Sequence, residues 1–207
     1  MNFSTLIGLS GISLLLCVLL LRFLILFNLK KAIVYILLLL FFLLTFVSID
    51  GNSINQYFRG IFNDLSISSL ILMIYYLFTY QNTPIQTDSV LRIIALSGLI
   101  FYPLALGLSP IDPYAWGYFN NIHAYIAPLL FLLVLFSLLT YAFYKKDLMT
   151  LICLLGASLA FQLNILESRN LWDYLLDPII FIFALFSILI SMFRQRKSEK
   201  TVKPSTL

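Results

Sequence analysis

Residues 167–178, Glu-Ser-Arg-Asn-Leu-Trp-Asp-Tyr-Leu-Leu-Asp-Pro, form the densest group of polar side chains between two hydrophobic runs. Carboxylates accept hydrogen bonds from hydroxyl groups, and aromatic rings stack on the apolar faces of sugars. A guanidinium group can hold a phosphate through paired hydrogen bonds. This mixture therefore indicates a site for a sugar or a polar lipid headgroup. Its members are Glu167, Arg169, Trp172, Asp173, Tyr174 and Asp177.

A second stretch, residues 112–118, has the same character, because it also combines an acid with proline, tryptophan and tyrosine. An arginine and an aspartate in the polar segment 50–64 add to the set. The residues expected to contact a headgroup or a partner protein are Arg59, Asp64, Tyr114, Trp116, Tyr118, Arg169, Trp172, Tyr174 and Asp177. The alternative interpretation is structural, since Trp and Tyr anchor helices at both membrane interfaces and Asp before Pro is common turn chemistry.

Four residues are candidates for acid–base catalysis: Asp112, His123, Glu167 and Asp173. His123 is the only histidine, and with Asp112 or Glu167 it could form a pair that titrates near neutral pH. The alternative is that His123 caps a helix or lies at the membrane interface. The chain has no His-Glu-x-x-His zinc motif and no Gly-x-Ser-x-Gly nucleophile motif. We expect no metal site and no cofactor.

The composition indicates what kind of scaffold positions these residues. Of the 207 residues, 61% are hydrophobic and 11% are charged, and the mean hydropathy is +1.00. The apolar runs approach the roughly 20 residues that a bilayer requires of a helix. They are continuous rather than alternating, which indicates helices and not barrel strands. We therefore predict an all-α, polytopic integral membrane protein with a single domain, residues 1–193. Cys17 and Cys153 fall inside apolar runs, so no disulfide is expected.

Seven membrane-spanning helices are predicted, with six as the fallback if one of the short helices inserts only halfway. Pro103 predicts a kink in the fourth helix, and Asp64 or Ser66 is the expected N-cap of the third. The tail, residues 194–207, is basic and is predicted to be disordered in the cytoplasm. The predicted helices cover residues 5–27, 32–49, 65–80, 90–108, 122–144, 148–166 and 178–193.

The distribution of basic residues predicts the orientation of the chain. With seven spans, Arg59 and Arg169 are the only basic residues in the loops on one side, whereas the loops and the tail on the other side are rich in Lys and Arg. Basic loops remain in the cytoplasm, so the N-terminus is predicted outside and the C-terminus inside. The acidic and aromatic stretches then all face outward. The compact chain and its short loops favour the bacterial inner (cytoplasmic) membrane.

Residues 57–72 carry a partial family resemblance. Gly60, Phe62 and the run Asp64-Leu65-Ser66, followed by an apolar helix, resemble a segment in the membrane domains of lipoteichoic-acid-synthase-like and phosphoglycerol-transferase-like proteins. Those proteins carry a soluble, metal-dependent catalytic domain after their helices, and this chain has a basic tail instead. No nucleophile or metal ligand is therefore carried over. The resemblance implies a non-catalytic membrane module that handles lipid or envelope polymer, or that assists a separate enzyme.

Three functions remain open from the sequence. The leading hypothesis is a non-enzymatic envelope accessory or lipid-handling subunit, whose outer loops meet membrane lipids or another envelope membrane protein and no nucleic acid. The second is a membrane-embedded transferase or hydrolase that acts on a lipid-linked substrate. The third is a small transporter, although the charges lie at helix ends rather than at the bilayer midplane, which argues against transport.

Overall fold

A computed structural model describes residues 2–80, 87–119 and 126–202 of the protein. Its fold is all-α, with 79% of the described residues in helices, which confirms the predicted class. Among these residues, two helical segments are long and apolar enough to cross a membrane, Phe3–Phe27 and Asp88–Leu108. The remaining apolar helices are shorter, with 10 to 17 residues: Lys31–Leu44, Ile67–Thr79, Pro128–Tyr144, Leu148–Gln162 and Pro178–Arg194.

The first two apolar helices form a pair. Helix α1 (Phe3–Leu24) continues into the 3-10 turn η1 (Ile25–Phe27), and α2 (Lys31–Leu44) follows. Asn28 adopts a left-handed backbone conformation with a φ of 49°, which helps reverse the chain between them. The pair packs through a small apolar cluster in which Cys17 is buried.

Helix α2 ends at residue 44 rather than at the predicted residue 49, because the chain turns into a short antiparallel hairpin. Strands β1 (Ser48–Ile49) and β2 (Asn52–Ser53) flank Asp50 and Gly51. These two residues have φ values of 54° and 92°, and left-handed values at both central positions are typical of a two-residue hairpin turn. An Asp-Gly pair is a known signal for such a turn, so the sequence contained the information needed for this correction.

The segment predicted as a long polar loop contains a further helix, α3 (Ile54–Phe62). Ser53 and Gln56 form a capping box at its start, in which the Gln56 side chain accepts a hydrogen bond from the Ser53 backbone N–H at 2.7 Å. Asn55 is fully buried beneath the helix and donates a hydrogen bond to Ser13 of α1 at 3.2 Å. The capping box stabilises the start of α3, and the Asn55–Ser13 hydrogen bond holds α3 against α1.

Helix α4 (Ile67–Thr79) begins at one of the two predicted N-caps. The hydroxyl of Ser66 accepts a hydrogen bond from the backbone N–H of Ser69 at 3.2 Å, which satisfies one of the free donors at the start of the helix. The other candidate, Asp64, binds an arginine instead. This leaves α4 at 13 residues, shorter than the predicted span.

The α-helical hydrogen bonding of α5 (Asp88–Pro103) stops at the predicted proline. Wider π-helical turns follow as η2 (Leu104–Leu108), in which Gly107 has a φ of 85°. Proline lacks a backbone N–H and therefore disrupts the regular α-helical ladder. A short 3-10 helix, η3 (Tyr114–Gly117), then lies in the second acidic and aromatic stretch.

Four helices complete the chain: α6 (Ile126–Tyr144), α7 (Leu148–Gln162), α8 (Leu171–Leu175) and α9 (Pro178–Val202). Helix α7 ends four residues before the predicted residue 166, and the polar stretch 167–178 contains the short helix α8. The predicted disordered tail is corrected in part, because α9 continues through residues 194–202. Arg, Lys, Gln and Glu are all good helix formers, which explains the longer helix.

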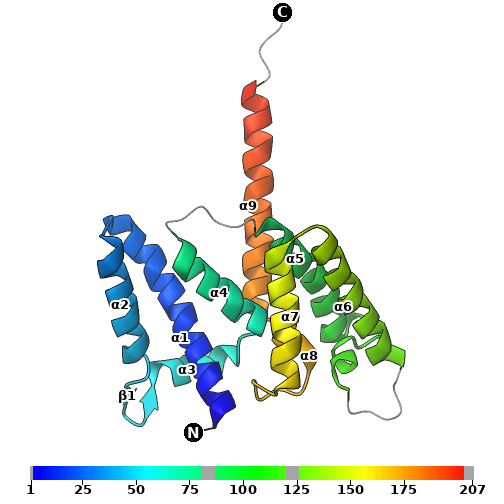
Figure 1. The fold of residues 1–207 in the computed structure, drawn as a ribbon, viewed down its shortest axis with the longest axis horizontal. Coiled ribbons are helices and arrows are strands. Elements are labelled where there is room, and N and C mark those ends of the chain that lie inside the picture. Colours follow the sequence, from blue (N-terminus) through cyan, green and yellow to red (C-terminus); the bar gives the residue numbers. More distant parts are fainter. Residues whose placement is uncertain (1, 81–86, 120–125, 203–207) are drawn as a thin grey trace, which may run out of the picture.

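The helices stand side by side with the two ends of the bundle clearly different (Figure 1). The N-terminus, the hairpin, α3 and α8 lie at one end, which we call the N-terminal face. The turns after η1 and after α6 lie at the opposite end, from which α9 projects. Helix α7 packs against α4, α6 and α8 at the centre. Helices α5 and α9 also pack closely. Gly98 of α5 permits this approach, because a Cβ atom at this position would overlap the ring of Phe181 of α9.

Candidate functional site

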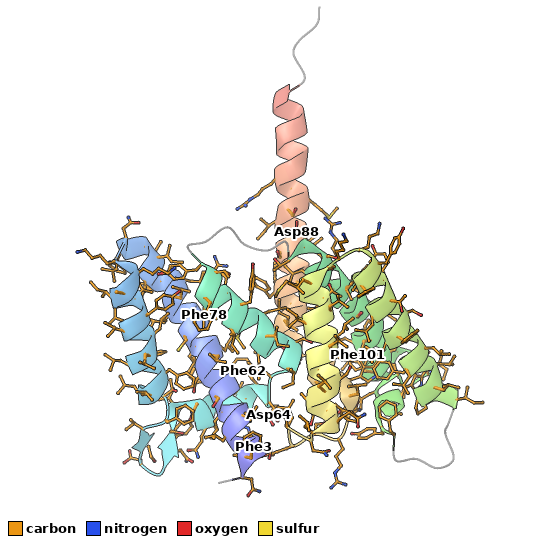
Figure 2. All side chains as sticks on the ribbon, in the orientation of Figure 1. Phe3, Phe62, Asp64, Phe78, Asp88 and Phe101 are labelled. Atoms are coloured by element: carbon orange, nitrogen blue, oxygen red, sulfur yellow. The ribbon has the colours of Figure 1, made fainter. Side chains whose placement is uncertain are left out.

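Polar side chains from several connections meet at the N-terminal face and line a cavity of about 740 Å³, which we call the acidic cavity. Figure 2 shows Asp64 at the same end of the bundle as Phe3 and far from Asp88. The carboxylates that line the cavity are Asp64, Asp112, Glu167, Asp173 and Asp177. The structure thus brings together three of the four residues predicted as catalytic, and His123 lies outside the described residues.

Arg59 of α3 neutralises part of this charge. Its Nε and Nη2 atoms lie 2.6 and 2.9 Å from the two carboxylate oxygens of Asp64. Its Nη2 atom also lies 2.9 Å from Oε1 of Glu167. Thr5 of α1 donates its hydroxyl to the same Glu167 oxygen at 2.8 Å. These four residues, the Arg59 clasp, join α1, α3 and two connections of the chain. Arg59 therefore already has two partners, which leaves it poorly placed to bind a phosphate as predicted.

Hydrogen bonds within the Arg59 clasp favour the charged forms of Glu167 and Arg59. The hydrogen bond from Arg59 lowers the pKa of Glu167 below its ordinary value, and the bond from Thr5 adds to this effect. The hydrogen bond to Asp64 in turn raises the pKa of Arg59. The clasp also requires a glycine on α1, because a Cβ atom at Gly8 would overlap the Asp64 carboxylate.

Asp177 joins the starts of two helices at the floor of the cavity. One of its oxygens accepts hydrogen bonds from the backbone N–H and the hydroxyl of Ser66, at 2.9 and 2.7 Å, and from the hydroxyl of Ser69. The other oxygen accepts from the backbone N–H of Ile180 at 2.9 Å, as an N-cap of α9 does. The predicted binding residue Asp177 is therefore buried and holds α4 against α9.

Asp173 occupies one wall of the cavity. It accepts hydrogen bonds from the hydroxyls of Tyr114, at 2.9 Å, and Ser168. Burial raises the pKa of Tyr114, and hydrogen bonds to Tyr118 and Asp173 raise it further. Tyr114 therefore stays protonated and donates to Asp173 at neutral pH. Asp112 lies at the exposed edge, where it accepts a hydrogen bond from the backbone N–H of Tyr114 at 3.0 Å.

Trp172 connects the two stretches predicted to carry the site. Its ring lies between Phe101 of α5 and Phe131 of α6, with centroid distances of 4.4 Å to each. Its indole N–H donates to the carbonyl of Pro113 at 2.8 Å. The fully buried Asn170 adds a second link, because its amide donates to the Tyr114 carbonyl at 2.8 Å. The ring of Trp172 is thus a fixed structural element beside the cavity.

Tyr174 is the clearest departure from the predicted site. It is 0% exposed, and its hydroxyl binds the backbone of Leu166 and Ser168. Burial raises the pKa of this hydroxyl, so it remains a neutral donor. A headgroup cannot reach such a side chain, and Tyr174 instead holds the α7–α8 connection in place. Sequence reasoning grouped it with the site because it lies between two aspartates.

The remaining predicted residues lie around the rim or away from the cavity. Tyr118 is exposed, and its ring packs edge-on against Tyr114. Trp116 faces α6 instead, where it lines a separate apolar hollow. Arg169 is exposed and lines a neighbouring hollow of about 560 Å³, whose wall at residues 166–168 is shared with the acidic cavity. Of the two predicted phosphate-binding arginines, only Arg169 has its guanidinium on an open surface.

The lining of the acidic cavity determines what it can bind. Its carboxylates and the Asn63 and Ser168 side chains offer many acceptors, and Phe101, Tyr102 and Tyr114 add aromatic walls. None of the described lining residues is a lysine or an arginine. The cavity therefore suits hydroxyl or ammonium donors better than anions. The described residues contain no group of three or more His, Cys, Asp or Glu side chains arranged for a metal ion.

Comparisons with known proteins add no further identification. No family model, no curated protein and no solved structure matches this chain.

Several contacts of the site could not be predicted from the sequence. Thr5 and Asn170 complete the hydrogen bonding of Glu167 and Tyr114 through contacts that are distant in the chain. Ser66 and Ser69 bind Asp177 across more than a hundred residues. Spacing along one helix gives no signal for such pairs, because their partners meet only after the bundle packs.

Proposed function

We propose that this chain is a seven-span membrane protein that binds a polar headgroup in the acidic cavity, on the outer side of a bacterial inner membrane. It acts as a lipid-handling or envelope accessory subunit rather than as an enzyme. The observation that carries the proposal is the convergence of the acids and aromatic rings from residues 112–118 and 167–178 on one cavity at the N-terminal face. The carboxylates would accept hydrogen bonds from the hydroxyl or ammonium groups of the headgroup.

The distribution of charge along the bundle supports the proposed orientation. The turns opposite the N-terminal face contain Lys30, Lys31, Lys145 and Lys146, and α9 carries its basic residues beyond that end (Figure 1). The N-terminal face carries five carboxylates around one cavity. By the positive-inside rule, the basic end lies in the cytoplasm and the cavity lies outside.

Seven spans require that the shorter apolar helices also cross the bilayer. Helix α4, with 13 residues, is about 20 Å long at 1.5 Å per residue, against a hydrocarbon thickness of about 30 Å. A short span is accommodated by local thinning of the bilayer. Large apolar side chains on α2 and α6 are exposed along these helices, as lipid-facing surfaces require.

Cysteine labelling would test the orientation. The two native cysteines, Cys17 and Cys153, are both buried, so they leave a low background. We expect a membrane-impermeant maleimide to label Asn164→Cys in intact cells and to label Lys145→Cys only after the membrane is opened. The reverse pattern, or equal labelling of both variants in intact cells, would contradict the proposed topology.

The resemblance of residues 57–72 to the membrane domains of lipoteichoic-acid-synthase-like proteins is consistent with an accessory role. In the structure this segment comprises α3, Asp64 of the Arg59 clasp and the start of α4. It therefore forms one side of the acidic cavity, through Phe62, Asn63 and Asp64. A non-catalytic module that handles lipid would use this segment to shape its binding site.

Native mass spectrometry of the protein extracted gently from its own membrane tests the headgroup proposal. We expect a retained lipid or lipid-linked sugar, and we expect Asp173→Asn to weaken its retention because the substitution removes an anionic acceptor from the cavity wall. Asp147→Asn is the matched control, since Asp147 caps α7 at the opposite end of the bundle. A protein that retains no ligand in any form would contradict the proposal.

A membrane-embedded transferase or hydrolase is the second candidate, because three predicted catalytic acids share one cavity. In that case Asp112→Asn and Asp173→Asn would each abolish turnover of a lipid-linked substrate while the folded protein accumulates normally. Unchanged turnover in both variants would exclude a catalytic role for these acids. Binding without turnover in the unmodified protein would favour the accessory role.

A further inference from the structure

The lining of the acidic cavity includes exposed apolar residues as well as acids. They are Phe62, at the end of α3, and Ala105 and Leu106, on η2, and we call them the mouth. Phe62 is 42% exposed and Leu106 is 80% exposed, so both are apolar side chains on the surface as well as in the cavity wall. The cavity therefore combines carboxylates with apolar side chains that reach the surface at the mouth.

The mouth is continuous with a surface of lipid-facing character. Helix α3 is amphipathic: Ile54, Tyr57 and Ile61 form an exposed apolar face that leads to Phe62. On its opposite side Arg59 is fixed by the Arg59 clasp. A helix with an exposed apolar face and a polar face held by protein is typical of one that lies in the membrane interface. Figure 1 shows α3 near the N-terminal end of α1, so in the proposed orientation the mouth lies near the outer interface of the membrane.

The η2 part of the mouth has the same apolar character. Pro103 ends the α-helix, and the following turns of η2 carry the exposed Leu106, which lines the cavity, and the exposed Leu108. Exposed leucines of this kind are costly in water but not in the outer part of a hydrocarbon layer. A cavity whose polar interior reaches such a surface can take a headgroup while the attached chains stay in the bilayer.

We infer that the acidic cavity takes its ligand sideways from the outer leaflet, through the mouth between Phe62 and Leu106, and that the ligand is a membrane-anchored lipid rather than a water-soluble molecule. This inference rests on the proposed function and specifies its ligand class. The headgroup, which supplies hydroxyl or ammonium donors, enters the cavity, and the hydrocarbon chains lie against α3 and η2.

Two leucines on η2 provide a matched test. Leu106 and Leu108 are both 80% exposed, but only Leu106 lines the cavity. Tryptophan at either position suits the membrane interface, so each variant is expected to fold. At residue 106 the added ring would stand in the mouth. We expect Leu106→Trp to reduce lipid retention about tenfold, corresponding to about 1.4 kcal/mol, and Leu108→Trp to leave it unchanged, as measured by native mass spectrometry after gentle extraction.

Helix α3 offers a second, independent pair. Phe62 lines the mouth, whereas the neighbouring Ile61 is 74% exposed and lies outside the cavity lining. We expect Phe62→Trp to reduce lipid retention and Ile61→Trp to preserve it. Thermal unfolding of all four variants shows whether reduced lipid retention comes from misfolding. If one variant is destabilised, the comparison rests on the pair at the other position.

The outcomes separate this inference from the proposed function. If the unmodified protein retains a lipid and neither Leu106→Trp nor Phe62→Trp reduces it, the lateral mouth is wrong and headgroup binding stands. If the protein retains a water-soluble molecule and no lipid, the ligand class is wrong, although the cavity still binds. If it retains neither, both the inference and the proposed function fail.

Discussion

Asp177 at the start of α9 holds Ser66 at the start of α4, although 111 residues separate them in the chain. A single carboxylate thus receives donors from the free ends of two helices, where the positive ends of the helix dipoles favour a negative charge. Asp177 is 5% exposed, so these donors supply the hydrogen bonds that water would otherwise provide to its carboxylate. The relationship makes Asp177 a residue that stabilises the fold at the floor of the acidic cavity.

Asp177→Asn tests this role. The amide retains one acceptor oxygen but loses the negative charge and turns a donor toward other donors. We expect the variant to lose about 2–4 kcal/mol of stability, because buried donors are left without an acceptor. Thermal unfolding in detergent measures the loss, and Asp112→Asn, at the exposed edge of the same cavity, serves as the control. Equal melting temperatures for Asp177→Asn and the unmodified protein would contradict the assignment.

Arg59→Gln addresses the clasp. The substitution leaves the carboxylate of Asp64, whose side chain is only 11% exposed, without its charged partner. We expect a loss of about 1–3 kcal/mol, less than for a fully buried pair because the clasp is partly solvated. Arg169→Gln is the matched control, since Arg169 lies on the exposed α7–α8 connection, and its melting temperature is expected to stay within the error of the measurement. A larger effect at Arg169 than at Arg59 would show that the clasp is not the stabilising contact.

The ionisation of Glu167 is expected to contribute to the pH dependence of stability. Because Arg59 lowers the pKa of this carboxylate in the folded protein, its contribution is fully present above the ordinary pKa of 4.5 and is lost as the pH falls through the lower, folded value. We therefore expect the melting temperature to fall more steeply below pH 4.5 in the unmodified protein than in Glu167→Gln. Parallel curves for the two proteins would mean that Glu167 does not gain its charge-dependent stability from the clasp.

Gly8→Ala tests whether the Arg59 clasp requires close packing against α1. A Cβ atom at this position would overlap Asp64, so α1 must move or the Arg59–Asp64 pair must open. We expect a loss of about 1–3 kcal/mol, as is common for overpacked sites. The control is Gly11→Ala, one turn further along α1, where the added atom would meet only the flexible end of Leu70. If Gly11→Ala proved the more damaging of the two, close packing against Asp64 would not be the reason for the glycine.

The sequence predicted the all-α class, the kink at Pro103 and, as one of two candidates, the N-cap Ser66, because each depends on local chemistry. It also identified six of the carboxylates and aromatic rings that line the acidic cavity: Asp64, Asp112, Tyr114, Glu167, Asp173 and Asp177. It also grouped Tyr174 with the site, whereas the structure buries this ring against the α7–α8 connection, a contact between residues that only the fold brings together. Helices α3 and α8 were missed because each is short and lies within a polar stretch, where the count of apolar residues points to a loop.

The residues of the Arg59 clasp are synthesised at different times. Asp64 follows Arg59 by only five residues, whereas Glu167 is synthesised more than a hundred residues later. The partner that lies nearest in the chain is therefore available to the arginine before Glu167 has been synthesised. The contact between Arg59 and Glu167 joins the last third of the chain to the first third. A measurement of this contact would therefore report that these two parts of the bundle have come together.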